Sequence, residues 1–121
     1  MFLSAVVQVD LTTAELTAPD AGLSIPVVVG REGRDTPEGI YLVRRMHSDM
    51  LQQDVLVFMQ DGREVFAIHE NLVSRNPALA NPNPDARRLS AGCIGVSRAA
   101  FRRLWALKQQ LVLQIYRSRP R

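Results

Sequence analysis

Ser90-Ala91-Gly92-Cys93-Ile94 is the stretch that best indicates the fold and the chemistry of this 121-residue chain. It holds the only cysteine, placed after a glycine and shortly before a predicted helix. A thiol becomes a nucleophile when a base removes its proton and N–H groups stabilise the developing oxyanion. The Gly92-Cys93 turn can supply such N–H groups, and His69, which ends an apolar run, is the candidate base. A lone cysteine can equally be a buried, inert apolar residue, so the rest of the chain must decide.

An irregular segment, residues 70–89, separates the candidate base from the candidate nucleophile. It is rich in asparagine and proline: Asn71, Asn76, Pro77, Asn81, Pro82, Asn83 and Pro84. This composition predicts a loop without regular strand or helix for most of its length. Structureless loops of about 20 residues are uncommon in compact domains and are usually lids, binding loops or disordered segments. Because this segment joins His69 to Cys93, it favours the interpretation of Cys93 as a nucleophile over that of a buried, inert residue.

Short strands separated by turns make up the first two-thirds of the chain. Strands are predicted at 2–11, 15–17, 23–29, 39–43, 55–59 and 64–69, and Asp61-Gly62 predicts a β-hairpin between the last two. Ser97 is a good N-cap for a helix over 98–109, and a closing strand is predicted over 111–116. We therefore expect a mainly β fold, a compact sandwich or barrel with one helix after the cysteine.

Length and composition limit the possible classes. A chain of 121 residues with 46% hydrophobic content predicts a single globular domain spanning 1–121. No apolar run approaches the roughly 20 residues that span a bilayer, and the N-terminus lacks the features of a signal peptide. As written, the chain is expected to be cytoplasmic, trimmed, or exported by a route without a cleaved leader.

Charge and metal-ligand spacing argue against two further classes. The net charge is only +3, and much of the excess lies near the C-terminal end. The aromatic residues that would stack bases are scarce, so a solvated basic face is favoured over a nucleic-acid interface. Two histidines and one cysteine lack zinc-ligand spacing, so neither a metal site nor another cofactor is expected. A single cysteine cannot form an internal disulfide.

The order of these motifs resembles a known family, the L,D-transpeptidase catalytic domain, often called the YkuD domain. Its members carry a histidine at the end of a strand and, after a variable loop, a serine-x-glycine-cysteine motif followed by an apolar residue. The matches here are His69, Ser90, Gly92, Cys93 and Ile94, with upstream likenesses at Val7–Asp10, Val27–Gly30 and Thr36–Tyr41. Three positions depart from the common pattern: Ala91 replaces a histidine, Gly95 an arginine or asparagine, and Glu70 a glycine.

The resemblance implies acyl transfer on peptidoglycan stem peptides. Cys93 would attack the bond between diaminopimelate and D-alanine, with His69 as the base and the Glu70 carbonyl orienting its ring. The N–H groups of Ala91, Gly92 and Cys93 would form the oxyanion hole, and Ser90 would orient the loop or the histidine. Arg87 and Arg88, just before the motif, suit the carboxylates of the stem, although a solvated pair of loop residues is an equal alternative.

Several outcomes stay open at this point. The thioester could lead to cross-linking, L,D-carboxypeptidation or D-amino-acid exchange, at the cell wall or in the periplasm. A role as a secreted effector against a rival's wall is one expectation. A catalytically inactive family member that binds peptidoglycan or a protein partner is the alternative function, and a nucleic-acid binder a weaker one. The oligomeric state is left open.

Overall fold

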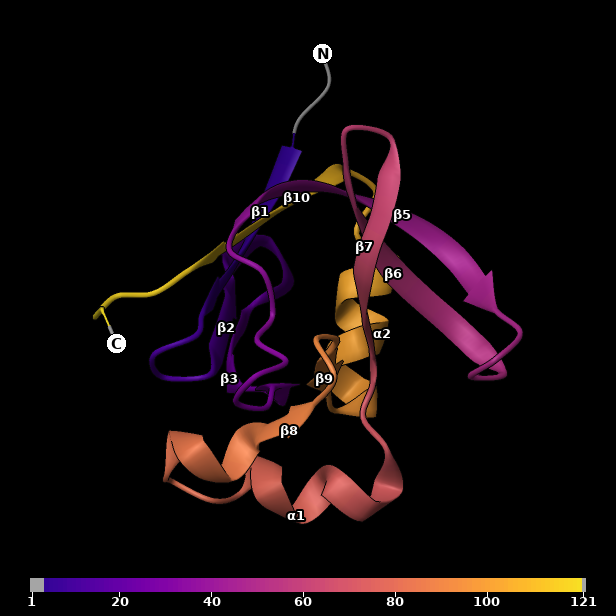
Figure 1. The fold of residues 1–121 in the computed structure, drawn as a ribbon. Coiled ribbons are helices and arrows are strands. Elements are labelled where there is room, and N and C mark those ends of the chain that lie inside the picture. Colours follow the sequence, from indigo (N-terminus) through magenta and orange to yellow (C-terminus); the bar gives the residue numbers. More distant parts are fainter. Residues whose placement is uncertain (1–3, 121) are drawn as a thin grey trace.

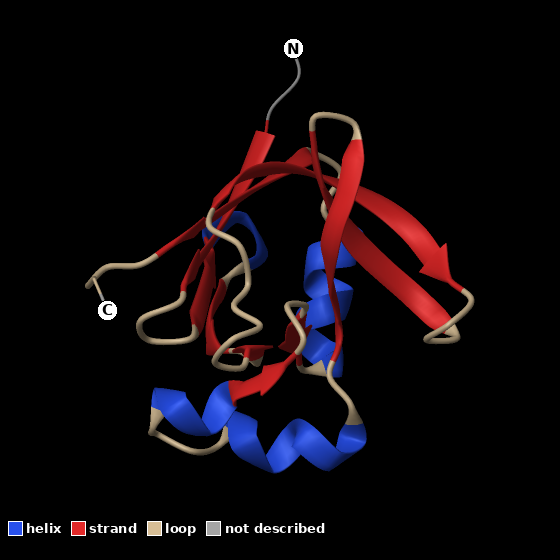
Figure 2. Ribbon diagram, in the orientation of Figure 1, coloured by secondary structure: helices blue, strands red, loops and turns tan. Residues whose placement is uncertain are grey.

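A computed structural model describes residues 4–120 and shows one large curved sheet with a helix in its hollow (Figures 1 and 2). The eight strands of this sheet lie in the order β3-β2-β1-β10-β5-β6-β7-β9. A short parallel pair, β4 and β8, lies beside it. The strands are β1 (Ser4–Asp10), β2 (Glu15–Ala18), β3 (Leu23–Pro26), β4 (Val29–Gly30), β5 (Gly39–Ser48), β6 (Gln53–Gln60), β7 (Arg63–Glu70), β8 (Arg88–Ser90), β9 (Ile94–Val96) and β10 (Gln110–Tyr116). The predicted mainly β, barrel-like fold is confirmed.

The strands nearest the two chain ends pair at the centre of the sheet. Strand β10 runs parallel to β1 and antiparallel to β5, so it joins the β1–β3 meander to the β5–β7 meander. Alternate residues of these strands face the interior, as the period of two requires. The core is formed by the inward residues of the sheet together with Ala100, Phe101 and Leu104 of α2 (Arg98–Ala106).

The helix after the cysteine begins as predicted but ends earlier. Ser97 Oγ accepts a hydrogen bond from Ala100 N at 3.2 Å, which is the expected N-cap. The helix ends at Ala106 rather than at residue 109. Arg45 of β5 contacts this end: its guanidinium donates to the carbonyl oxygens of Trp105 and Leu107 and lies 5.9 Å from the Trp105 ring centroid. No helix within residues 4–120 is long and apolar enough to cross a membrane.

Local turn chemistry agrees with the predicted hairpin. Asp61 and Gly62 have φ angles of 52° and 76°, the positive values that a tight two-residue hairpin requires. The strand predicted over 23–29 is instead two strands, β3 and β4. Between them, Val27 N donates to Ala14 O and Val28 pairs with Gly95, so the chain passes from one sheet to the next.

The prediction of an irregular loop over residues 70–89 is wrong for much of its length. This segment contains 3-10 turns at Val73–Arg75 and Pro84–Arg87 and a one-turn helix, α1 (Asn76–Leu79). Proline is tolerated in the first turn of a helix, where its missing N–H has no partner to lose. Pro77 and Pro84 lie there, so they begin these turns rather than forbid them.

Candidate active site

The cysteine lies in a tight loop between β8 and β9 that its own side chains hold in shape. Ser90 Oγ donates to Cys93 O at 2.6 Å and accepts from Gly92 N at 3.1 Å. Ser90 is only 3% exposed, so it orients this loop from within. Because the Gly92 N–H is already bonded to Ser90, it is less available as an oxyanion donor than the sequence prediction assumed.

Gly92 is required by both its backbone angle and its surroundings. Its φ is 137°, and an added Cβ would lie 2.4 Å from Cζ of the Phe66 ring. Its carbonyl accepts a hydrogen bond from Thr36 Oγ1 at 2.9 Å, and Thr36 in turn accepts from Gly30 N at 3.0 Å. Thr36 is 2% exposed. The loop that carries Cys93 is therefore fixed by a buried threonine far away in the sequence.

His69 lies near the end of β7 with its ring orientation defined. Its Nδ1 lies 2.8 Å from the carbonyl oxygen of Glu70, the partner that the resemblance implies. A carbonyl oxygen can only accept, so Nδ1 carries the proton and neutral His69 has its lone pair on Nε2. The Glu70 side chain pairs with Arg98 at 3.1 Å, at the start of α2. The bond from Nδ1 of His69 to Glu70 O leaves Nε2 as the basic nitrogen.

The β7–β9 ladder places His69 and the Cys93 loop on neighbouring strands, although His69 is not among the residues that line the groove beside Cys93. The two strands are parallel, with Ile68 opposite Ile94 and His69 opposite Gly95. Ile68 and Ile94 both point into the core. The residues that alternate with them, His69 on β7 and Cys93 just before β9, therefore share the other face. Cys93 lies two positions before Gly95, the residue opposite His69.

The environment of the thiol is partly apolar. Burial raises the pKa of Cys93, and a hydrogen bond from the backbone of Ala67 lowers it in part, with a net upward shift. The thiol therefore stays protonated at neutral pH unless a base removes its proton.

A groove of about 290 Å³ opens beside Cys93. Its lining is mostly apolar and comes from β5, β6, β7 and the β5–β6 turn: Met46, Met50, Leu51, Val55, Val57, Val65, Phe66 and Ala67. His47 and Glu64 also line it, and His47 Nδ1 lies 3.1 Å from Asp54 Oδ1. Within residues 4–120, no group of three or more His, Cys, Asp or Glu side chains is placed to hold a metal ion.

Arg87 and Arg88 make contacts other than those predicted. Arg87 is 4% exposed, and its guanidinium donates to the carbonyl oxygens of Thr13, Ala14 and Asn81. Arg88 donates to the carbonyls of Leu11 and Thr12 and pairs with Asp85. Both side chains thus fasten the segment before β8 to the β1–β2 turn. A contact with stem carboxylates stays a prediction, and these bonds give it no support.

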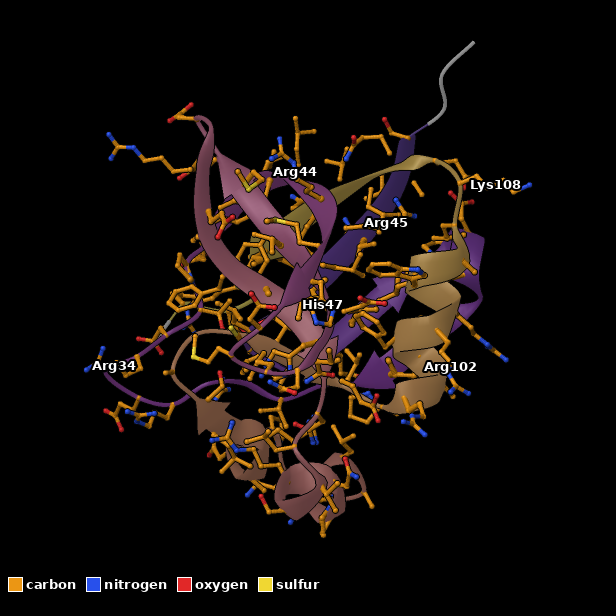
Figure 3. All side chains as sticks on the ribbon, turned by 90° about the vertical axis from the view of Figure 1, so that its right-hand side faces the viewer. Arg34, Arg44, Arg45, His47, Arg102 and Lys108 are labelled. Carbon is orange, nitrogen blue, oxygen red and sulfur yellow. The ribbon has the colours of Figure 1, made fainter. Side chains whose placement is uncertain are left out.

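The basic residues labelled in Figure 3 lie on separate elements. Arg34 extends from the loop before β5, whereas Arg102 and Lys108 lie on and just after α2, at the opposite side of that view. These three do not form one stripe.

Sequence reasoning missed three residues that shape the site. The sequence shows Thr36 only as the start of the likeness at Thr36–Tyr41, Phe66 as a residue of the strand predicted over 64–69, and Asn71 as one of several loop asparagines. Their roles depend on contacts with Gly92 and Gly95, which lie 20 or more residues away along the chain. Only the two glycines carried a visible signal, since a glycine inside a motif often marks a close approach.

Comparison with solved structures supports the fold. An L,D-transpeptidase from Enterococcus faecium superposes with a TM-score of 0.68 at 14% identity, covering 94% of this chain and 50% of that one. L,D-transpeptidase 3 from Mycobacterium tuberculosis gives 0.65 at 16% identity, covering 92% and 60%. The enzyme from Stackebrandtia nassauensis gives 0.56 at 18% identity, covering 95% and 56%. The chain thus spans about half to three-fifths of these structures. No curated protein matches it in sequence.

The family model of the L,D-transpeptidase catalytic domain, YkuD, matches residues 4–110. That range takes in β1 through the start of β10, and with them the Cys93 loop and the His69 strand. The chain therefore belongs to the YkuD family of L,D-transpeptidase catalytic domains.

Proposed function

We propose that this domain transfers acyl groups of peptidoglycan stem peptides through a thioester on Cys93. The observation that supports the proposal is that His69 on β7 and Cys93, directly before β9, lie on the same face by strand alternation, with Nδ1 of His69 bonded to Glu70 O. Because burial raises the pKa of Cys93, the thiol needs a base to remove its proton, and an imidazole of fixed orientation on the same face can be that base. Membership of the family supports peptidoglycan as the substrate class.

In the first half-reaction, His69 Nε2 takes the thiol proton and the Cys93 sulfur attacks the carbonyl between diaminopimelate and D-alanine. The oxyanion of the tetrahedral intermediate accepts hydrogen bonds from the N–H groups of Ala91 and Cys93, since Gly92 N is bonded to Ser90. Collapse of the intermediate breaks the C–N bond. The leaving amine of D-alanine takes the proton from His69, and the thioester remains on Cys93.

In the second half-reaction, an acceptor replaces D-alanine in the same groove. His69 takes a proton from the attacking amine or water as it adds to the thioester carbonyl. The C–S bond then breaks, and the thiol of Cys93 regains its proton. An amine of a second stem gives a cross-link, water gives carboxypeptidation, and a free D-amino acid gives exchange. The groove beside Cys93 provides room for either partner.

Tetrapeptide muropeptides and mass spectrometry test this proposal directly. We expect the wild-type domain to release one D-alanine per stem, and Cys93→Ala and His69→Ala to lose that release. Asn83→Ala is the control, because Asn83 lies outside the groove and its Oδ1 accepts from Asp85 N in an exposed part of the chain. The accompanying product, a dimer, a tripeptide or an exchanged stem, identifies the acceptor.

Alkylation with iodoacetamide separates this proposal from the alternative of an inactive binding domain. We expect Cys93 to react faster than a model thiol at neutral pH, and the rate to fall in His69→Ala. Bound but unchanged tetrapeptide, together with a slow Cys93, would instead indicate the non-catalytic family member.

A further inference from the structure

Asn71 is bonded to both halves of the site through its backbone. It directly follows β7, and its N–H donates to Val96 O of β9 at 2.8 Å. The carbonyl of the same peptide unit belongs to Glu70 and accepts the hydrogen bond of His69 Nδ1 at 2.8 Å. One peptide unit therefore links the imidazole to β9, the strand that follows Cys93. Hydrogen bonds in such a chain polarise and strengthen one another.

The side chain of Asn71 occupies the space in which a side chain at position 95 would lie. A Cβ added to Gly95 would lie 2.5 Å from Asn71 Oδ1 and 3.3 Å from Val28 Cβ. Gly95 lies directly opposite His69 in the ladder, so its missing side chain would project to the face that carries the imidazole. The amide oxygen of Asn71 thus lies on the His69 face, in a place open only because residue 95 is glycine.

The side-chain amide of Asn71 is a polar group in a buried position, where an unpaired polar atom costs free energy of folding. Asn71 is 5% exposed, and its Nδ2 donates to Asn76 Oδ1 at 3.3 Å. Among residues 4–120, Oδ1 is a buried side-chain oxygen without a hydrogen-bond partner. An apolar side chain of the same shape would fill this space without that cost. Buried unpaired polar atoms in folded proteins call for an explanation, and a role in the site is one.

We propose that Asn71 is a positioning residue for His69. Its side chain, wedged over Gly95, fixes the Glu70–Asn71 peptide that orients the ring. Its bare amide oxygen favours the positive imidazolium that forms when His69 takes the proton of Cys93, because a fixed dipole in a dry site acts strongly on charge that develops nearby. This inference rests on the roles proposed above for Cys93 and His69.

Asn71→Leu tests the inference, because leucine has nearly the same size and lacks the oxygen. The measurements are the rate of Cys93 alkylation by iodoacetamide across pH and the thermal unfolding midpoint. We expect the midpoint to stay or rise, while the rate at pH 7 falls at least about tenfold. The pH profile should move to higher pH, since the thiolate loses support. A folded Asn71→Leu with an unchanged rate and profile would show that Asn71 only fills space.

Gly95→Ala provides an independent arm if Asn71→Leu folds poorly. It keeps Asn71 but places a methyl group 2.5 Å from Oδ1, which must displace the amide. The same slowing and the same shift of the pH profile are expected, and an unchanged profile would overturn the inference. Asn83→Ala is the control, because Asn83 Oδ1 accepts from Asp85 N in the exposed part of the same segment. Its alkylation should match that of the wild type.

Two features keep this test separate from that of the proposed function. The alkylation assay uses no peptidoglycan, so a wild-type domain that releases no D-alanine would refute the proposed reaction without touching the result for Asn71. The variants also leave in place the charged and titratable groups of the surrounding elements: His47 of β5, Asp54 of β6, Glu64 and Glu70 of β7, and Arg98 of α2. A shift of the profile can therefore be assigned to the amide.

Discussion

Gly92 meets two demands that no other residue type satisfies together. Its φ of 137° lies where side chains are strained, and a Cβ would lie within 2.7 Å of three Phe66 ring atoms. We expect Gly92→Ala to destabilise the domain by about 2–4 kcal/mol, as strain and overpacking add. It should also slow the alkylation of Cys93, because the loop must move. Urea denaturation measures the first effect.

Gly62→Ala is the matched control for this prediction. Gly62 also has a positive φ, 76°, but nothing lies within 4 Å of the added Cβ. Backbone strain alone should cost about 1 kcal/mol there, with no change at Cys93. Equal losses of unfolding free energy in Gly92→Ala and Gly62→Ala would mean that the clash with Phe66 contributes nothing to the destabilisation.

At the scale of elements, the buried Arg87 is one of two arginines that join the segment between β7 and β8 to the β1–β2 turn. Arg87 donates to the carbonyls of Thr13, Ala14 and Asn81, and burial lowers the pKa of its guanidinium. We expect Arg87→Met to remove the guanidinium donor from each of these carbonyls, of which Ala14 O keeps the bond from Val27 N, and to cost about 2 kcal/mol. Hydrogen exchange should accelerate within residues 72–90 before the rest of the domain. Arg102→Met, at an exposed position on α2, should change neither quantity.

Local sequence patterns were sufficient for some elements and not for others. The Asp61-Gly62 hairpin and the Ser97 cap each depend on chemistry within a few residues, and both predictions are confirmed. The sequence predicts an end of α2 three residues later than the observed one, and it gives no sign that Arg45, 60 positions away, bonds to the carbonyl of Trp105 there. The motif predicts Cys93 and His69 as the reacting pair, whereas the contact of Thr36 with the Gly92 carbonyl is visible only in the folded chain.

At the scale of the whole molecule, the first and last strands pair with each other in the middle of the sheet. Strands β1 and β10 pair in parallel over seven residues each, from Ser4 opposite Gln110 to Asp10 opposite Tyr116. Parallel neighbours need a long connection, and here the connection is almost the entire chain. No local pattern could place the last strand between β1 and β5, because the placement depends on pairing across more than 100 residues.

Asp10 joins the β1–β2 turn to the chain after β10, through hydrogen bonds whose contribution to stability depends on pH. Its Oδ1 accepts from Thr12 N at 2.9 Å and from Ser118 N at 3.1 Å. Burial raises the pKa of Asp10, but the hydrogen bonds from Ser118 and Thr12 outweigh it and hold the pKa below its usual value. A carboxylate with a lowered pKa in the folded state stabilises that state above the pKa of the unfolded chain. This contribution is lost as the pH falls through the folded-state value.

Asp10→Asn should therefore lower the free energy of unfolding at pH 7 by about 1 kcal/mol, the scale of a hydrogen bond to a charged group that is partly solvated. The difference from the wild type should shrink as the pH falls from 3.8 through the lower pKa of the folded state, below which both side chains are neutral. Urea denaturation at pH 7 and near pH 3 measures it, with Asp49→Asn, whose side chain is fully exposed, as the control. A difference that stays constant with pH would mean that the shape of the side chain, rather than its charge, joins the β1–β2 turn to the C-terminal segment.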